Sequence, residues 1–258
     1  MKIQILNKKG DKISFIAEGI TPALANALRR IMISEIPTMA IQWVDIRENS
    51  SILFDETVAH RMGLIPIKFD PDKFNFAEDC KCGGKGCPLC QVAFSLEKAG
   101  SGVVYSGDMV SSNKAVKPTD PNFPIVKLLE NHSVKMDAVA RLGLGVQHAK
   151  HQAAIASYQY YPEMKVNSCS DPRKVVASCP KGVIALKGKT PYIKDPKNCD
   201  LCRSCEEVCD GLKVVGVPGK FIFNVESVSG LEPAYIVGRA ADILAEKAEK
   251  FKKKIAKI

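Results

Sequence analysis

The sequence predicts an α+β protein, and three observations support this fold class. Apolar and polar residues alternate over the first twenty residues and again over 220–228, which is typical of half-buried strands. Apolar residues recur at helical spacing after Pro22 and after Pro233. Ten cysteines gather in two separate clusters, and in a chain without a secretion signal such clusters favour metal or redox chemistry over disulfides.

The overall composition is that of an ordinary globular chain, with 258 residues, 46% of them hydrophobic and 25% charged. No apolar run approaches the roughly 18 residues of a membrane helix, and the N-terminus lacks the apolar core of a signal peptide. We therefore expect a cytoplasmic protein with no membrane contact. The net charge of +9 favours acidic partners, but lysines of the last 13 residues supply much of it, so direct DNA contact is not expected.

The N-terminal segment predicts two strands joined by a turn at residues 8–11, then a helix. Thr21 suits the helix N-cap, and Pro22 suits its first position. Leu24, Leu28 and Ile31 would share one face of this helix. The helix should end before Pro37, and a strand over 39–46 should follow.

Residues 47–165 predict a second, mixed unit. It contains a helical run that ends within 60–67, a cysteine cluster at 80–90, a long connection over 106–124 and a strand over 134–139. Beyond the cysteine-rich residues 166–212, the sequence predicts a last strand over 220–228 and a long terminal helix. This helix carries one apolar stripe that must be buried against something, formed by Ile236, Ala240, Ile243, Leu244, Phe251 and Ile255.

The strongest motif is Cys199-x2-Cys202-x2-Cys205-x3-Cys209. This spacing is typical of iron–sulfur ferredoxins, in which three cysteines bind one cluster and the fourth serves another. The remaining ligand of the first cluster should come from a distant Cys-Pro pair, and Cys179-Pro180 is present. We therefore expect one iron–sulfur cluster, a four-iron cubane or the three-iron form that remains when one iron is lost. Its ligands would be Cys179, Cys199, Cys202 and Cys205.

A second cluster is not expected. The same spacing, counted back from Cys179, gives Val175, Pro172 and Cys169, so two of the ligands are missing. Cys169 and Cys209 would be left together, close enough in a ferredoxin-like fold for a disulfide. The alternative for the whole segment is that its cysteines bind zinc or are merely buried.

The second cysteine motif is Cys80-x-Cys82-x4-Cys87-x2-Cys90, with a Gly-Gly-Lys-Gly turn in its centre. Four thiolates with no open position suit structural, tetrahedral zinc. The alternative is a metal-free surface loop.

Other candidate sites are weak. His148 and His151 could share a face, but no carboxylate or cysteine lies near them in sequence, so a solvated or partner-contacting pair is favoured over a metal site. No phosphate-binding loop, nucleophile elbow or paired-carboxylate signature is present. The sequence therefore predicts no catalytic site.

Three segments outside the cysteines resemble the signatures of the alpha-type assembly subunits of cellular RNA polymerases. They are ANALRRIMISEIP at 25–37, AHRMGLIPI at 59–67 and GLGVQHAKHQ at 143–152. The ferredoxin-like insert that follows them is similar to that of the archaeal D-type members of the family.

The resemblance implies a non-catalytic scaffold in transcription. Such subunits pair with the smaller subunit L and, with small subunits N and P, form the platform for the two large catalytic subunits. The implied organisation is a dimerisation domain from both chain ends (1–46 and 213–258), an insert domain (47–165) and a ferredoxin-like domain (166–212). The motif match places partner contacts at Asn26, Arg29, Arg30, His60 and Arg61.

One rival hypothesis comes from the cysteines alone. A ferredoxin-type electron-transfer or redox-sensing protein would also need the cluster, but it would not need the three polymerase segments.

Overall fold

The computed structural model describes residues 1–256, and the chain divides into two compact units. The first unit comprises Met1–Arg29 and Ala156–Val225, and the second comprises Arg30–Ile155 and Glu226–Ile258. Strands and helices are both plentiful, which confirms the α+β prediction.

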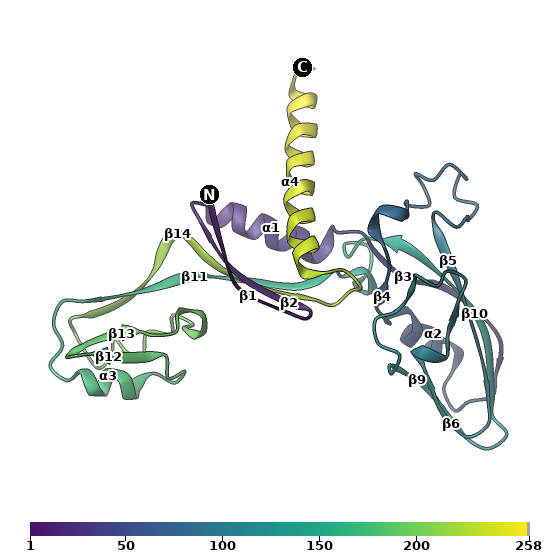
Figure 1. The fold of residues 1–258 in the computed structure, drawn as a ribbon, viewed down its shortest axis with the longest axis horizontal. Helices are drawn as coiled ribbons and strands as arrows, with labels where there is room; N and C mark the ends of the chain where they lie inside the picture. Colours follow the sequence, from purple (N-terminus) through teal and green to yellow (C-terminus); the bar gives the residue numbers. More distant parts are fainter. Residues whose placement is uncertain (257–258) are drawn as a thin grey trace. The chain divides into compact units, whose positions relative to one another are not determined.

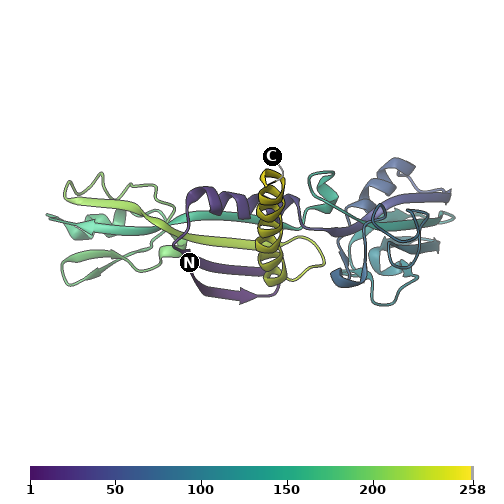
Figure 2. The ribbon, with the colours of Figure 1, turned by 90° about the horizontal axis from the view of Figure 1, so that it is seen from above.

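The first unit is built on a four-stranded sheet in the order β1-β2-β14-β11. Figure 2 shows these strands side by side, although they come from the beginning, the middle and the last part of the chain. The core includes Phe15, whose ring stacks on that of Phe223 with centroids 5.0 Å apart. The strands are β1 (Lys2–Lys9), β2 (Lys12–Glu18), β14 (Leu212–Ser227) and β11 (Ala154–Val166).

The predicted hairpin is confirmed, with Lys2 opposite Glu18 and Lys9 opposite Lys12. Its outer strand differs from the half-buried strand that was predicted. Ile3 and Ile5 are 54% and 62% exposed, because β1 is an edge strand with a neighbour on one side only.

Helix α1 (Pro22–Ser34) forms where the sequence predicts it, and the boundary between the units falls within it. The Leu24 N–H donates to Thr21 Oγ1 over 3.2 Å, so Thr21 is the N-cap. The most buried side chains are those of Ala25, Ile31 and Met32, while Leu24 and Leu28 are only half-buried. The buried face of α1 is thus rotated slightly about the helix axis from the predicted face of Leu24, Leu28 and Ile31.

The cysteine-rich segment of the first unit contains one short helix and a two-stranded hairpin. The elements are α3 (Pro172–Ser178), β12 (Ile184–Lys187), β13 (Thr190–Ile193) and the 3₁₀ turn η4 (Pro196–Asn198). Asp171 caps α3 by accepting from the backbone N–H groups of Arg173 and Lys174. The core of this segment is small, and its buried members are Val175, Val183, Ile184, Cys205, Cys209, Leu212 and Val214.

The second unit is built on an antiparallel sheet in the order β3-β10-β5-β7, with helix α2 against β3 (Figure 1). One face of the sheet is buried by large apolar residues such as Phe94, Leu96 and Met136. The elements are β3 (Thr38–Asn49), α2 (Asp55–Gly63), β5 (Gln91–Ala99), β7 (Val110–Ser111) and β10 (Ser133–Gly143).

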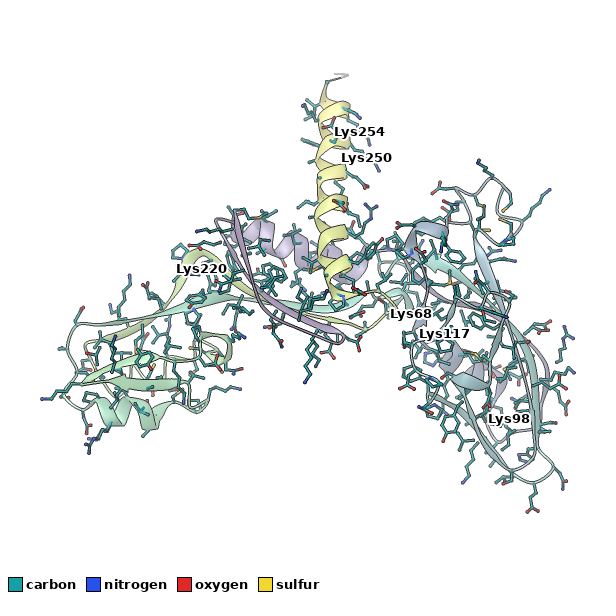
Figure 3. The ribbon with its side chains drawn as sticks, in the orientation of Figure 1. Lys68, Lys98, Lys117, Lys220, Lys250 and Lys254 are labelled. Atoms are coloured by element: carbon teal, nitrogen blue, oxygen red, sulfur yellow. The ribbon has the colours of Figure 1, made fainter. Side chains whose placement is uncertain are left out.

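Smaller elements complete the second unit, including two pieces of strand within the predicted long connection over 106–124. Lys68 and Lys117 face each other across the β4–β8 pair (Figure 3). These elements are β4 (Ile67–Lys68), η1 (Pro71–Lys73), β6 (Gly102–Tyr105), η2 (Ser106–Asp108), β8 (Lys117–Pro118), β9 (Pro124–Leu128) and η3 (Ala149–His151).

The C-terminal helix α4 (Pro233–Ile255) is buried only near its start. Ile236, Ala240 and Ile243 are buried, but every described residue from Ala245 onward is exposed. Lys250 and Lys254 mark this exposed part in Figure 3. Across residues 1–256, no helix combines the length and the apolar character needed to cross a membrane.

Candidate metal centres and candidate subunit surface

The first candidate centre is formed by Cys80, Cys82, Cys87 and Cys90, whose four sulfur atoms lie within 4.8 Å of one another. The Sγ–Sγ distances are 3.5 Å for Cys80–Cys87, 3.6 Å for Cys82–Cys90 and 3.8 Å for Cys87–Cys90. Four sulfurs about 2.3 Å from a tetrahedral zinc ion would lie about 3.8 Å apart. The four sulfurs are therefore close enough to hold one metal ion, and their spacing is compatible with tetrahedral coordination.

The glycines between these cysteines explain how so short a segment brings four sulfurs together. Gly83, Gly84 and Gly86 have positive φ angles of 63°, 78° and 94°, a region that glycine adopts without steric cost. The resulting turns begin with a hydrogen bond of 2.9 Å from the Gly83 N–H to the Cys80 carbonyl.

Protons are shared unequally among these thiols when no metal replaces them. A backbone hydrogen bond from Gly86 is the main reason that the pKa of Cys82 falls to about 6. At Cys80 a backbone hydrogen bond from Cys82 lowers the pKa, but the Cys87 thiol and burial outweigh it and raise the pKa to about 12. The Cys82 sulfur can thus bind as a thiolate, whereas the Cys80 thiol must release a proton as a metal binds.

Gln91 connects this loop to the sheet. Its side chain lies against Gly86, where an added Cβ would stand 2.5 Å from the Gln91 amide nitrogen. Its Oε1 accepts hydrogen bonds from Arg141 Nε and Nη2 at 3.2 and 2.8 Å. The Arg141 guanidinium in turn stacks over the Trp43 ring, 4.4 Å from its centroid. A chain of contacts therefore runs from the metal loop to the only tryptophan.

The second candidate centre is a cavity in the first unit that all four predicted cluster cysteines line. Cys179, Cys199, Cys202 and Cys205 surround it, together with apolar side chains such as Met164 and Ile184. Among the described residues, only the 80–90 group brings its sulfurs close enough to hold a single ion. Four cysteines around one cavity are the type of ligand that an iron–sulfur cluster uses.

The loop that carries three of these cysteines is held in a strained conformation. Leu201 and Arg203, on either side of Cys202, have φ angles of 57° and 65°. Non-glycine residues in this region cost about 1–3 kcal/mol each and concentrate at functional sites. Burial is the main cause that raises the pKa of Cys205, to about 11, so a bound cation must displace protons here.

Cys169 and Cys209, the other predicted pair, are both free thiols in the structure. The Cys209 thiol donates to the Ser168 carbonyl over 3.3 Å, and a hydrogen bond with the Cys169 thiol is the main cause that raises its pKa. The two positions at which the ferredoxin spacing lacks cysteines have structural roles, because Pro172 begins α3 and Val175 is fully buried in the small core.

Three sequence segments, 25–37, 59–67 and 143–152, meet beside strand β3 in the second unit. The Val146 N–H donates to the Ser34 carbonyl over 2.9 Å, and Thr38 Oγ1 donates to the His151 carbonyl over 2.9 Å. His60 and His148 line one cavity, which brings the second and third segments together. We call the residues around this cavity the β3 surface, formed by Ile41, Gln42, Val44, Ala59, His60, Gly63, Leu64, His148 and Lys150.

The predicted partner residues fall into two local groups. Asn26 Oδ1 accepts hydrogen bonds from Arg29 Nε and Nη2 at 3.1 and 3.0 Å, and Arg30 is exposed. On α2, Arg61 Nη1 donates to the Ile125 carbonyl over 2.9 Å, so this guanidinium holds the helix against β9. His60 is exposed at the β3 surface.

The prediction that His148 and His151 form a solvated or partner-contacting pair is wrong for His151. That ring is 4% exposed, and its Nδ1 lies 3.0 Å from the Thr38 carbonyl. Gly143 leaves space for it, since an added Cβ would stand 2.5 Å from Nε2 of the ring. Reasoning from sequence missed this role, although the glycine eight residues earlier was a signal of close packing.

Comparison with known proteins matches residues 44–163 to the RNA polymerase Rpb3/RpoA insert domain. The chain is also similar to proteins named DNA-directed RNA polymerase subunit Rpo3. The protein from Archaeoglobus fulgidus is 40% identical, over 100% of this chain and 98% of the relative. The protein from Methanosarcina acetivorans is 36% identical over 96% of each chain, and that from Thermococcus kodakarensis is 36% identical over 100% and 99%.

Proposed function

Because the chain belongs to the Rpo3 family of alpha-type DNA-directed RNA polymerase subunits, we propose that it pairs with subunit L to form the platform for the large catalytic subunits. The chain is a non-catalytic assembly subunit of the polymerase complex. Small subunits N and P would complete the platform, and the complex would act in the cytoplasm. Direct DNA contact is not part of the proposal.

The observation that carries the pairing is the unfinished apolar stripe of α4. Ile236, Ala240 and Ile243 are buried within the chain, but Phe251 and Ile255 continue the stripe and are 66% and 54% exposed. An apolar stripe on an otherwise charged helix is a surface for a partner. We propose that subunit L covers it.

The domain organisation is proposed on two grounds. The shared sheet of β1, β2 and β14 joins the N-terminal hairpin to a strand near the C-terminal end, and this supports a dimerisation domain built from both chain ends. We propose that it extends over residues 1–46 and 213–258, although β3 and α4 lie in the second compact unit. The match over 44–163 supports an insert domain over 47–165. We assign the remaining residues, 166–212, to a ferredoxin-like domain. Asn26, Arg29, Arg30, His60 and Arg61 are proposed to contact or support partner subunits.

For cofactors, we propose structural zinc at the 80–90 cysteines and one iron–sulfur cluster at Cys179, Cys199, Cys202 and Cys205. The tetrahedral sulfur spacing supports the first, and the cysteine-lined apolar cavity supports the second. Cys169 and Cys209 are proposed to form a disulfide on oxidation. The rival idea of a free-standing redox protein is not favoured, because the full-length relatives are polymerase subunits.

The pairing is tested with Phe251→Glu, co-expressed with subunit L of the same organism. Burying a phenylalanine side chain contributes about 1.5–3 kcal/mol, so we expect the heterodimer affinity to fall roughly 10- to 100-fold. Lys252→Gln is the matched control, because it changes the net charge equally in the same helical turn. Light scattering after size exclusion reports the complex, and a parent chain that stays monomeric in the presence of subunit L contradicts the proposal.

A further inference from the structure

The cavity at the β3 surface is lined by basic, apolar and neutral polar groups and by no acidic group. It has a volume of about 150 Å³ and includes the side chains of His60, His148 and Lys150. No aspartate or glutamate is among its lining residues. The size suits one side chain from another molecule, and the charge suits an anion.

Lys150 is the strongest reason to expect an anion. Its side chain is half-buried, and its ammonium donates to the Ile41 carbonyl over 3.0 Å. Across the described part of the chain, no carboxylate oxygen lies within 4.0 Å of this ammonium. Burial lowers the pKa of Lys150, because the ammonium group is partly removed from water and no counter-ion compensates for this loss. Two of its three N–H donors remain available.

His148 adds a second donor. Its Nδ1 accepts the Lys150 backbone N–H over 3.1 Å, so in the neutral ring the proton is on Nε2. His60 brings another imidazole from α2 to the same cavity.

A larger hollow of about 560 Å³ shares Gln42, His148 and Lys150 with this cavity. It contains the stacked pair of Arg141 and Trp43, and the Trp43 side chain is 51% exposed. Glu78 and Asp79 line the hollow but not the smaller cavity. An occupant could therefore place an acidic group beside Lys150 and an apolar neighbour on the indole.

We propose that the β3 surface binds an aspartate or glutamate side chain of another polymerase subunit, with Lys150 as its main partner and His148 as a second donor. This inference rests on the proposed function, because it takes the partner to be a subunit of the same complex. A carboxylate would supply the missing counter-ion and would accept hydrogen bonds from the Lys150 ammonium and from His148. Charge-assisted hydrogen bonds of this kind are strong when they are partly buried.

The direct test is zero-length carbodiimide cross-linking of the assembled polymerase, followed by peptide mass spectrometry. This reagent joins a lysine amine to a carboxylate only when the two are in contact. We expect a cross-link between Lys150 and an aspartate or glutamate of another subunit. A Lys150 amine that is acetylated equally fast in the free chain and in the assembled polymerase overturns the inference.

The second test compares Lys150→Gln with the parent chain in reconstitution with purified polymerase subunits. We expect about tenfold weaker binding of the contacted subunit and a shallower salt dependence. Lys150→Arg should restore the affinity, and Lys114→Gln, at an exposed lysine of the same unit, should not change it. If Lys150→Gln assembles as well as the parent, the inference about Lys150 is overturned but the proposed function is not. If the parent chain itself fails to assemble, the proposed function is contradicted.

Discussion

At the scale of single residues, His151 and the two nearby glycines explain much of the 143–152 segment. The ring of His151 fills the space beside Gly143 and closes onto Thr38. Gly145 allows the backbone to approach α1, since an added Cβ would stand 2.8 Å from the Ile33 carbonyl. This segment therefore positions Lys150 by tight packing around it.

His151 should make stability depend on pH. Burial is the main cause that lowers its pKa to about 4, with smaller contributions from Lys150 and His148, while the hydrogen bond to Thr38 opposes the shift. In the unfolded chain a histidine pKa is about 6.5. The unfolded state thus binds more protons between these two values, and stability falls as the pH drops from about 6.5 towards 4.

The test is the thermal midpoint between pH 7 and pH 4.5 for the parent and for His151→Asn. The asparagine amide can donate to the Thr38 carbonyl but does not titrate in this range. For the parent we expect the titration of His151 to lower the free energy of unfolding by on the order of 3 kcal/mol over this pH range. For the variant we expect the thermal midpoint to depend less on pH. Parallel profiles would show that His151 does not titrate as described.

At the scale of elements, the 80–90 loop is attached to the sheet by one side chain. Gln91 is the first residue of β5 and touches both Gly86 of the loop and Arg141 of β10. We therefore expect order in the loop to influence where the Arg141 guanidinium lies over Trp43.

Removal of zinc from this loop should be visible in the fluorescence of Trp43. When the loop loses its metal, Gln91 loses its support at Gly86, Arg141 shifts, and the indole becomes more exposed to water. We expect emission at longer wavelength after a chelator has removed the zinc, with release of zinc measured by a dye. The Gln91→Ala variant should show the shifted spectrum with zinc bound, and a parent spectrum unchanged by complete zinc release contradicts this coupling.

At the scale of the whole molecule, the two units differ in what holds them together. The second unit has a well-filled sheet core that includes Phe94, Leu96 and Met136. The core around the cysteine-rich segment of the first unit has only seven buried residues, two of them cysteines. So small a core seldom folds without a metal or another cross-link.

Loss of one cluster ligand should therefore unfold this segment selectively. In Cys202→Ser we expect faster proteolysis within residues 166–212 and weaker assembly of the polymerase, with pairing to subunit L retained. Cys169→Ser, studied under reducing conditions, is the matched control, because Cys169 is half-buried and outside the cysteines that line the cavity. Equal proteolysis and assembly of Cys202→Ser and parent would show that the cluster is dispensable.

Much of the local structure could be predicted from the sequence, because it depends on neighbours in the chain. The β1–β2 hairpin, the Thr21 cap and the 80–90 sulfur geometry are of this kind. Strand β11 was not predicted, since its neighbour in the sheet, β14, is distant in sequence. Helix α3 was also missed, although it packs against the nearby β12 and β13 and begins with Asp171 and Pro172, which are local start signals. The β3 surface combines residues up to 109 positions apart, such as Ile41 and Lys150, so no local pattern indicates it.

The burial of Val175 has a consequence for any attempt to build a second metal cluster into this chain. Val175 has no exposed surface and lies on a helix that begins at Pro172. Cysteines at positions 172 and 175 would therefore remove a core side chain and the proline that suits the first helical position. We expect such a variant to lose packing in the small core before it gains a cofactor.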